Sequence, residues 1–251
     1  MTSPADRQDK GHYSYSHYAS REVAQGFDAL RFGGPIGEYL AEAQAAILRE
    51  AFEPVEGRSI LDVGTGTGRA AVQLARAGAR VIGVDASVEM LEVARVRAVD
   101  AGVSLTLGQS DAHDLPFADQ SVDGAVSLRV LMHAIDWRKC LSELCRVARW
   151  RVIVDFPAAL SFAALESGAR NLALRAGRPV EAYRVMREAD VERVFARHGF
   201  RVVMVRRQFV LPIALHKAMG SLALTSRLEG SLKAVGLLRA LGSPVTMVAE
   251  R

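Results

Sequence analysis

The chain has 251 residues, of which 50% are hydrophobic and 24% are charged, and its formal net charge is +4. This is the composition of a globular protein, and charged residues or glycines interrupt every hydrophobic stretch before it could cross a bilayer. No transmembrane helix is therefore expected, and the length suits one large domain with insertions.

The first ten residues bear on the cellular location of the protein, and its two cysteines bear on whether it binds a metal. Residues 1–10 are polar and carry two aspartates, unlike the basic and then apolar plan of a secretory signal, so we expect a cytoplasmic protein. Cys140 and Cys145 are the only cysteines, too few for a zinc site. We expect both to be buried and reduced, and we expect no bound metal.

Charge is distributed unevenly along the chain. Residues 1–150 hold 16 Lys and Arg against 20 Asp and Glu, whereas residues 151–251 hold 16 against 8. A basic second part can attract an anionic substrate, acidic lipid headgroups or nucleic acid over long range. An arginine-rich soluble surface explains the same numbers equally well.

Hydrophobic periodicity predicts strands that alternate with helices. A glycine turn over 64–68 joins the first strand to a helix over 69–76, and Ser87 and Asp136 stand where the N-caps of two further helices are expected. This alternation predicts an α/β fold with a Rossmann-like, doubly wound and mostly parallel sheet. The seven predicted strands are 59–63, 80–84, 103–107, 122–128, 152–155, 201–205 and 245–249.

Two connections are longer than is usual in such folds. Residues at about 157–188 and 211–242 are predicted to be helical insertions, because apolar residues such as Leu224 and Leu228 recur there near the helical period. The apolar run 211–215 suggests a pocket or surface for a hydrophobic acceptor. Core packing or dimerisation explains such a stripe as well.

The strongest functional signal is the glycine-rich segment 62–68, which lies between a predicted strand and a predicted helix. Glycines lack a Cβ atom, so a ligand can approach the backbone closely, as it does in nucleotide-binding loops. The dinucleotide fingerprint requires glycine where Arg69 stands, which disfavours NAD and FAD. Asp85 ends the second strand, where a carboxylate can accept hydrogen bonds from both hydroxyls of a ribose. Asp111 either holds the exocyclic amine of an adenine or stabilises a turn.

As a set, these segments resemble the successive motifs of class I S-adenosylmethionine-dependent methyltransferases. The matching segments are Ile60–Gly68, Val84–Ser87, Asp111-Ala112 and Ser121–Val126. The resemblance is nearest to the branch that acts on small molecules in ubiquinone and menaquinone biosynthesis. It implies S-adenosylmethionine as the cofactor and a sheet whose last strand is antiparallel. It also implies that residues 51–251 form the methyltransferase domain and that residues 1–50 form an N-terminal helical lid or arm.

The resemblance further assigns residues to the cofactor. It implies that Asp62 holds the ammonium group of the methionine part, that Asp85 binds the ribose, and that Asp111 and Ala112 contact adenine. Met90 or Leu115 would cover the ring face. The residues predicted to bind the cofactor are Asp62, Gly64, Thr65, Gly66, Gly68, Asp85, Ala86, Met90, Asp111, Ala112 and Leu128.

Two departures from the family pattern bear on the acceptor and the fold. The Lys-Pro-Gly-Gly turn before the fifth strand is absent, and residues 146–151 stand in its place, which predicts a shorter connection. The Asn/Asp-Pro-Pro-Tyr motif of enzymes that methylate amines of nucleic-acid bases is also absent, since the fourth strand runs into Ser127–Val130. We therefore expect a small-molecule acceptor and no nucleic acid partner.

Four residues are candidates for work on the acceptor. His133, just beyond the fourth strand, either removes a proton as a general base or starts a helix with its ring bonded to backbone or water. Arg129 either anchors an anionic group of the acceptor or pairs with Asp136. Tyr18, in an aromatic N-terminal segment, and Tyr183, in the first insertion, are further candidates for substrate contact.

The predicted function is methyl transfer from S-adenosylmethionine to a small, hydrophobic molecule. Such a transfer is an in-line displacement in which alignment and exclusion of water supply much of the rate, so a base is optional. A non-catalytic S-adenosylmethionine-binding module, an NAD-dependent dehydrogenase and an RNA methyltransferase attracted by the basic second part remain as alternatives. Peripheral membrane contact and a homodimer are both compatible with the sequence.

Overall fold

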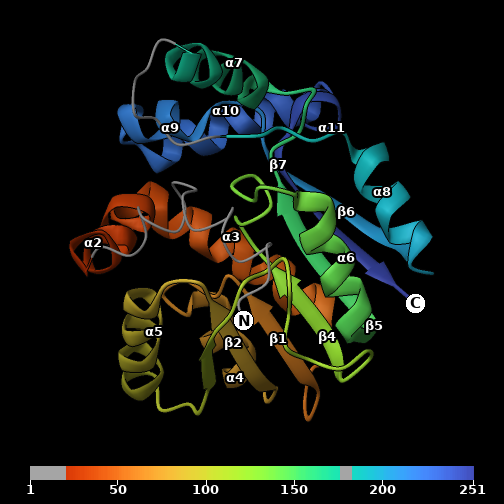
Figure 1. Ribbon diagram of the computed structural model, residues 1–251. Coiled ribbons are helices and arrows are strands. Elements are labelled where there is room, and N and C mark those ends of the chain that lie inside the picture. Colours follow the sequence, from red (N-terminus) through yellow and green to blue (C-terminus); the bar gives the residue numbers. More distant parts are fainter. Residues whose placement is uncertain (1–20, 176–182) are drawn as a thin grey trace.

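A seven-stranded sheet forms the centre of the computed structural model, which describes residues 21–175 and 183–251 (Figure 1). The strands are β1 Ser59–Val63, β2 Arg80–Asp85, β3 Thr106–Gln109, β4 Val122–Ser127, β5 Ala148–Phe156, β6 Arg201–Phe209 and β7 Ser243–Glu250. Their order across the sheet is β3-β2-β1-β4-β5-β7-β6. Strand β7 is antiparallel to both of its neighbours, whereas β1 to β5 pair in parallel. The Rossmann-like sheet with an antiparallel last strand is thus confirmed.

Helices cover both faces of this sheet. Ser87 caps one of them by accepting a hydrogen bond from the backbone of Met90, and Asp136 caps another through the backbone of Arg138 and Lys139, as the sequence predicts. The helices within the described residues are α2 Arg21–Phe32, α3 Gly34–Phe52, α4 Arg69–Arg76, α5 Val88–Asp100, α6 Trp137–Val147, α7 Phe162–Arg175, α8 Glu188–Arg197, α9 Ile213–Met219, α10 Leu222–Ala234 and α11 Leu237–Leu241.

Three strands differ most in extent from the prediction. The third strand, predicted over 103–107, is β3 at Thr106–Gln109, because pairing with residues 82–85 of β2 fixes its position. The fifth begins at Ala148 instead of 152, since α6 passes into β5 with no loop between them. The sixth extends to Phe209 because it pairs with β7 as far as Ser243. Local periodicity could not show any of these tertiary pairings.

The core lies on both faces of the sheet. Neighbouring residues of β1 point to opposite sides, so Leu61 packs in a cluster with α6 and α8, whereas Ile60 packs with α3 and α4. Both side chains are fully buried. A parallel sheet covered on two faces explains why the strand sequences are apolar without alternation.

The two long insertions supply helices beside the carboxyl ends of the strands (Figure 1). Helix α7 lies in the first, and α9, α10 and α11 lie in the second. Glu229 on α10 connects the second insertion to the end of β6 through hydrogen bonds. Its carboxylate accepts hydrogen bonds from the backbone N–H groups of Val210 and Leu211, each at 2.9 Å, and lies 2.9 Å from His216 Nε2.

Cys140 and Cys145 are both free and buried, as expected. Burial raises the pKa of each thiol, so neither is a reactive thiolate near neutral pH. Among the described residues, no helix has the length and apolar character needed to span a bilayer.

Candidate cofactor and acceptor site

A cavity of about 680 Å³ lies at the carboxyl ends of the central strands. Strands β1 and β4 are neighbours although β2 and β3 follow β1 in the chain, so the direction of strand order reverses between them. Ligands of open α/β sheets bind in the crevice at such a reversal. The site therefore lies where the topology alone would place it.

The glycine loop forms one wall, and its three glycines differ in role. Gly64 has a φ of 71°, and a Cβ atom there would lie 2.2 Å from Cγ2 of Val130, so packing excludes any side chain. Gly66, with a φ of 54°, lines the cavity, and no atom lies within 4 Å of the place where its Cβ would be. Gly68 faces Ala94 of α5 instead and does not line the cavity. Gly66 is thus the position open to a ligand.

Asp85 holds the glycine loop from the neighbouring strand. Its Oδ2 accepts a hydrogen bond from the backbone N–H of Gly66 at 2.8 Å, and its Oδ1 accepts one from Ser87 at 2.9 Å. Burial raises the pKa of this carboxyl, whereas the N–H groups of Ser87, Gly66 and Ala86 lower it. A carboxylate has about four acceptor positions, so these hydrogen bonds leave acceptor capacity for a ligand hydroxyl.

Asp62 lies at the bottom of the same wall and is 2% exposed. Its Oδ2 accepts a hydrogen bond from the hydroxyl of Thr65 at 2.7 Å. Burial raises the pKa of Asp62 to about 6, with a further increase from the charge of Asp85, while the Thr65 hydroxyl and the Ala71 backbone oppose the shift. A cationic group bound beside this carboxylate would offset its cost of burial.

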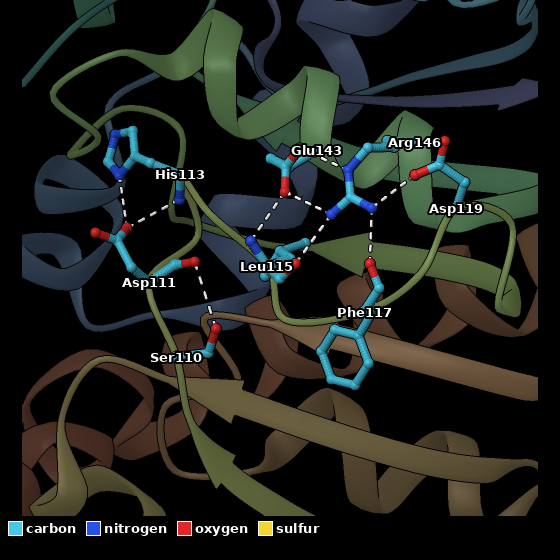
Figure 2. A network of polar contacts seen from close by, with 8 residues as sticks. All are labelled: Ser110, Asp111, His113, Leu115, Phe117, Asp119, Glu143 and Arg146. Carbon is cyan, nitrogen blue, oxygen red and sulfur yellow. Dashed lines mark hydrogen bonds and ion pairs between the residues drawn. The ribbon is translucent and has the colours of Figure 1, made fainter. Parts of the chain in front are cut away.

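The loop after β3 carries Asp111, which is paired with His113 (Figure 2). Asp111 Oδ1 lies 2.7 Å from His113 Nδ1 and accepts a hydrogen bond from the His113 backbone at 2.9 Å. On the other side of the ring, His113 Nε2 accepts from the backbone N–H of Asp136 at 3.2 Å. These contacts assign the proton of the neutral ring to Nδ1. Sequence reasoning missed His113, although its spacing of two from Asp111 is the signal of such a pair.

Arg146 fixes the rest of this loop (Figure 2). Its guanidinium donates to the carbonyl oxygens of Phe117 at 2.7 Å and Leu115 at 2.9 Å, and to Asp119 at 2.8 Å. Glu143 binds the same guanidinium and accepts from the backbone N–H of Leu115 at 2.9 Å. The segment that replaces the Lys-Pro-Gly-Gly turn therefore begins with a residue that holds the loop carrying Asp111 and Ala112.

Helix α2 contacts the glycine loop through polar side chains. Asp28 accepts a hydrogen bond from the Thr67 hydroxyl at 3.0 Å and forms ion pairs with Arg97 and, at 3.8 Å, Arg69. The guanidinium of Arg69 lies 3.8 Å from the ring centre of Phe32. Arg69, at the position where a dinucleotide fold requires glycine, thus binds the helix that covers the loop.

The cavity continues beyond β4. His133 is 8% exposed, and its ring centre is 6.5 Å from that of Tyr183. Arg129 has a φ of 64°, a left-handed conformation that is strained for a residue with a side chain, and its backbone N–H donates to Asp155 Oδ1. The interpretation that Arg129 pairs with Asp136 is not supported, since Asp136 caps α6.

Asp155 is a second site residue that sequence reasoning missed. It lies near the end of β5, lines the cavity and is 1% exposed, and among the described residues its Oδ2 has no hydrogen-bond partner. Burial raises its pKa, while the charge and the N–H of Arg129 and the side chain of Gln44 lower it. An acidic residue near the end of an apolar strand, at the same edge as Asp62 and Asp85, was the available signal.

Most of the predicted residues meet at this one cavity. Tyr18 lies outside the described residues, Gly68 does not line the cavity, and Leu115 is buried in the core, whereas Met90 lines it. The predicted residues that line the cavity are Asp62, Gly64, Thr65, Gly66, Asp85, Ala86, Met90, Asp111, Ala112, Leu128, Arg129, His133 and Tyr183.

Comparison with known proteins agrees with this fold. Residues 61–152 match the family described as methyltransferase domain. The O-methyltransferase cnsE of Penicillium expansum is 41% identical over 102 residues, which are 38% of this chain and 36% of that protein. The demethylmenaquinone methyltransferase of Clavibacter sepedonicus is 43% identical over 100 residues, or 39% and 40% of the two chains. The chain thus spans less than half the length of either relative.

A solved structure extends the fold comparison to nearly the whole chain. Magnesium protoporphyrin IX methyltransferase from Synechocystis PCC 6803, crystallised with bound SAH, superposes with a TM-score of 0.65 at 19% identity, over 95% of this chain and 98% of that one. At this level of identity the superposition concerns the fold alone. Residues 61–152, from β1 into β5, are the part of the chain that matches the methyltransferase domain family.

Proposed function

We propose that this protein transfers a methyl group from S-adenosylmethionine to a hydroxyl group of a small molecule. The observation that carries the proposal is the arrangement of Asp62, Gly66 and Asp85 around one cavity that continues past β4 to His133 and Asp155. The matched methyltransferase family and the relatives named as O-methyltransferases support it.

The residues present fit S-adenosylmethionine, which supplies a methyl group on a positively charged sulfur. Asp62 is a buried carboxylate with a raised pKa, which suits the ammonium group of the methionine part. The open backbone at Gly66 admits the ligand closely, and Asp85 has acceptor capacity for ribose hydroxyls. Asp111, oriented by His113, is the proposed partner of the adenine amine.

The acceptor is proposed to lie between β4, β5 and the insertion helices. Phe162 of α7 and Ile213 of α9 line this part of the cavity, so an acceptor with apolar surface is favoured. His133 would take the proton of the reacting hydroxyl as the charge develops, and Asp155 Oδ2 would accept a hydrogen bond from a second donor group of the acceptor and orient it. Tyr183 and Arg129 are proposed to complete this wall.

Methyl transfer can be tested by incubating the protein with S-adenosylmethionine labelled in its methyl group and a panel of hydroxylated quinones and phenols. We expect label in an organic product whose mass has increased by one methylene, at a rate that His133→Ala lowers. If the protein binds S-adenosylmethionine and transfers label to RNA but to no member of this panel, the proposed acceptor class is refuted.

A further inference from the structure

Exposed apolar side chains are concentrated on the two insertions. The described residues expose fifteen large hydrophobic side chains, and ten of them lie in residues 160–172 and 215–237. Single exposed apolar residues are ordinary, but such a concentration marks an interaction surface. We name these ten the insertion face: Leu160, Phe162, Leu165, Leu172, Leu215, Leu222, Leu224, Leu228, Val235 and Leu237.

The residues of the insertion face follow helical stripes. On α10, Leu224 and Leu228 are one turn apart and 44% and 37% exposed, while Thr225 and Glu229, one residue further on, are buried against the protein. On α7, Leu165 and Leu172 are two turns apart and 71% and 69% exposed. Each of these helices thus has an apolar stripe directed to solvent.

The exposed charged side chains of α10 and α11 are all basic. Arg227, Lys233 and Arg239 are exposed, and none of them has an acidic partner among the described residues. Glu229, the single acidic residue of 211–242, is buried and bound to the backbone of Val210 and Leu211. On α7 the exposed Glu166 is paired with Arg170 at 2.7 Å. Exposed leucines next to Lys and Arg, with no exposed acid on α10 and α11, are the features of helices that lie in the interface of an anionic bilayer.

Other occupants fit this surface less well. In a twofold dimer formed through the insertion face, the basic side chains of one copy would approach those of the other, since such an interface uses the same patch twice. Residues 1–20 of this chain carry two acidic and two basic side chains, so they offer no net negative charge. We infer that the insertion face binds the surface of membranes that contain anionic lipids.

The insertion face is continuous with the cavity. Phe162 belongs to both, and Ile213, Ala214 and Lys217 of α9 line the cavity beside the exposed Leu215. A protein bound through α7 and α9–α11 would therefore present this side of the cavity to the lipid. The inference concerns binding alone and stands whether or not methyl transfer occurs.

Co-sedimentation of the full chain with vesicles tests the inference. We expect binding to phosphatidylcholine vesicles that contain about 30% phosphatidylserine, little binding to phosphatidylcholine alone, and release at about 0.5 M salt. Replacing Arg227, Lys233 and Arg239 by Gln should lower the partition coefficient on the order of 100-fold, since each charge near the surface contributes about fivefold. Leu224→Ser with Leu228→Ser should lower it more than about tenfold.

Matched variants elsewhere provide the controls. Val96 and Val99 are 61% and 73% exposed on α5, and changing both to Ser should leave vesicle binding unchanged. Replacing the exposed Arg80, Arg95 and Arg201 by Gln removes the same amount of charge and should weaken binding less than the triple change in α10 and α11. Failure of the wild type to bind anionic vesicles would overturn the inference. Equal effects of the two triple Gln variants on vesicle binding would also overturn it. So would a dimer in solution that dissociates when Leu224 and Leu228 are changed to Ser.

Discussion

The carboxylate of Asp85 and the backbone N–H of Gly66 are joined by a hydrogen bond of 2.8 Å, so the end of β2 holds the tip of the glycine loop. The two residues lie beyond Val63 of β1 and Val84 of β2, the last pair of these parallel strands. Because Asp85 is both the support of the loop and the proposed ligand of the ribose, its removal affects both the shape of the site and its contacts.

Asp85→Ala should therefore weaken binding of S-adenosylhomocysteine at least about 100-fold, since two charge-assisted hydrogen bonds to hydroxyls contribute about 1.5 kcal/mol or more each. Isothermal titration calorimetry measures this directly. Asp85→Asn retains one acceptor oxygen and should lose less. Equal affinity of wild type and Asp85→Ala would show that the ribose does not bind here.

Asp62→Asn should stabilise the unliganded protein at pH 8 while it weakens cofactor binding. The pKa of Asp62 is about 6 in the folded chain and near its ordinary value of 3.8 in the unfolded chain. The folded state therefore holds the proton more tightly, and this group's contribution to stability falls as the pH rises from about 4 to about 6.

At pH 8 the ionised, buried Asp62 costs the folded state up to about 3 kcal/mol, which the neutral amide avoids. Chemical unfolding of wild type and Asp62→Asn at pH 4 and pH 8 measures the difference between them. We expect a gap in unfolding free energy of about 1–3 kcal/mol at pH 8 that is much smaller at pH 4. A gap that grows toward low pH would contradict the raised pKa.

The two cavity glycines should respond differently to alanine. Gly64→Ala places a Cβ 2.2 Å from Val130 and should destabilise the fold by about 2 kcal/mol or more, through overlap and the left-handed backbone. Gly66→Ala meets no atom within 4 Å, so it should cost about 1 kcal/mol of stability from its φ alone but reduce cofactor affinity. Thermal unfolding and calorimetry on both variants separate the two effects. A Gly66→Ala protein with unchanged affinity would remove Gly66 from the binding site.

Arg146→Gln should loosen the loop that carries Asp111. The change removes contacts to two carbonyl oxygens and to Glu143, for a loss of about 2 kcal/mol and a fall in Tm of about 4–8 °C. Cofactor affinity should fall as well, although Arg146 is not among the residues that line the cavity. Arg193→Gln, which breaks an exposed ion pair with Asp190 on α8, is the control and should change little. Similar losses in both variants would argue against a special role for Arg146.

Asp155→Asn should separate cofactor binding from turnover. The proposed role of Asp155 is with the acceptor, so affinity for S-adenosylhomocysteine should stay within about twofold of wild type. Methyl transfer to a responsive acceptor should fall about 10–100-fold in kcat/KM, because the hydrogen bond that orients the acceptor is lost. Loss of cofactor affinity in this variant would instead place Asp155 in the cofactor pocket.

That the glycine loop and Asp85 line one cavity could be predicted from the sequence, because these residues lie in short, contiguous segments. Asp62 to Gly66 form one loop, and Asp85 ends the next strand, so the order of strands brings them together. The exception is Gly68, where the same glycine pattern serves packing against Ala94. Sequence spacing cannot separate a glycine that faces a ligand from one that faces a helix.

The supporting residues could not be predicted in the same way, because they act across long sequence distances. Arg146 binds the carbonyls of Leu115 and Phe117, about thirty residues earlier, and Asp155 accepts a hydrogen bond from the N–H of Arg129, which lies just beyond the neighbouring strand β4. These contacts depend on α6 passing without a loop into β5 and on the parallel pairing of β4 with β5. Hydrophobic periodicity carries no information about them.

Titration calorimetry of the wild-type protein with S-adenosylmethionine, S-adenosylhomocysteine and NAD tests the central claim most directly. The account predicts micromolar or tighter binding of the two S-adenosyl compounds, no binding of NAD, and loss of S-adenosylhomocysteine binding in Asp85→Ala. A folded wild-type protein that binds neither S-adenosyl compound, or that binds NAD in their place, would contradict it.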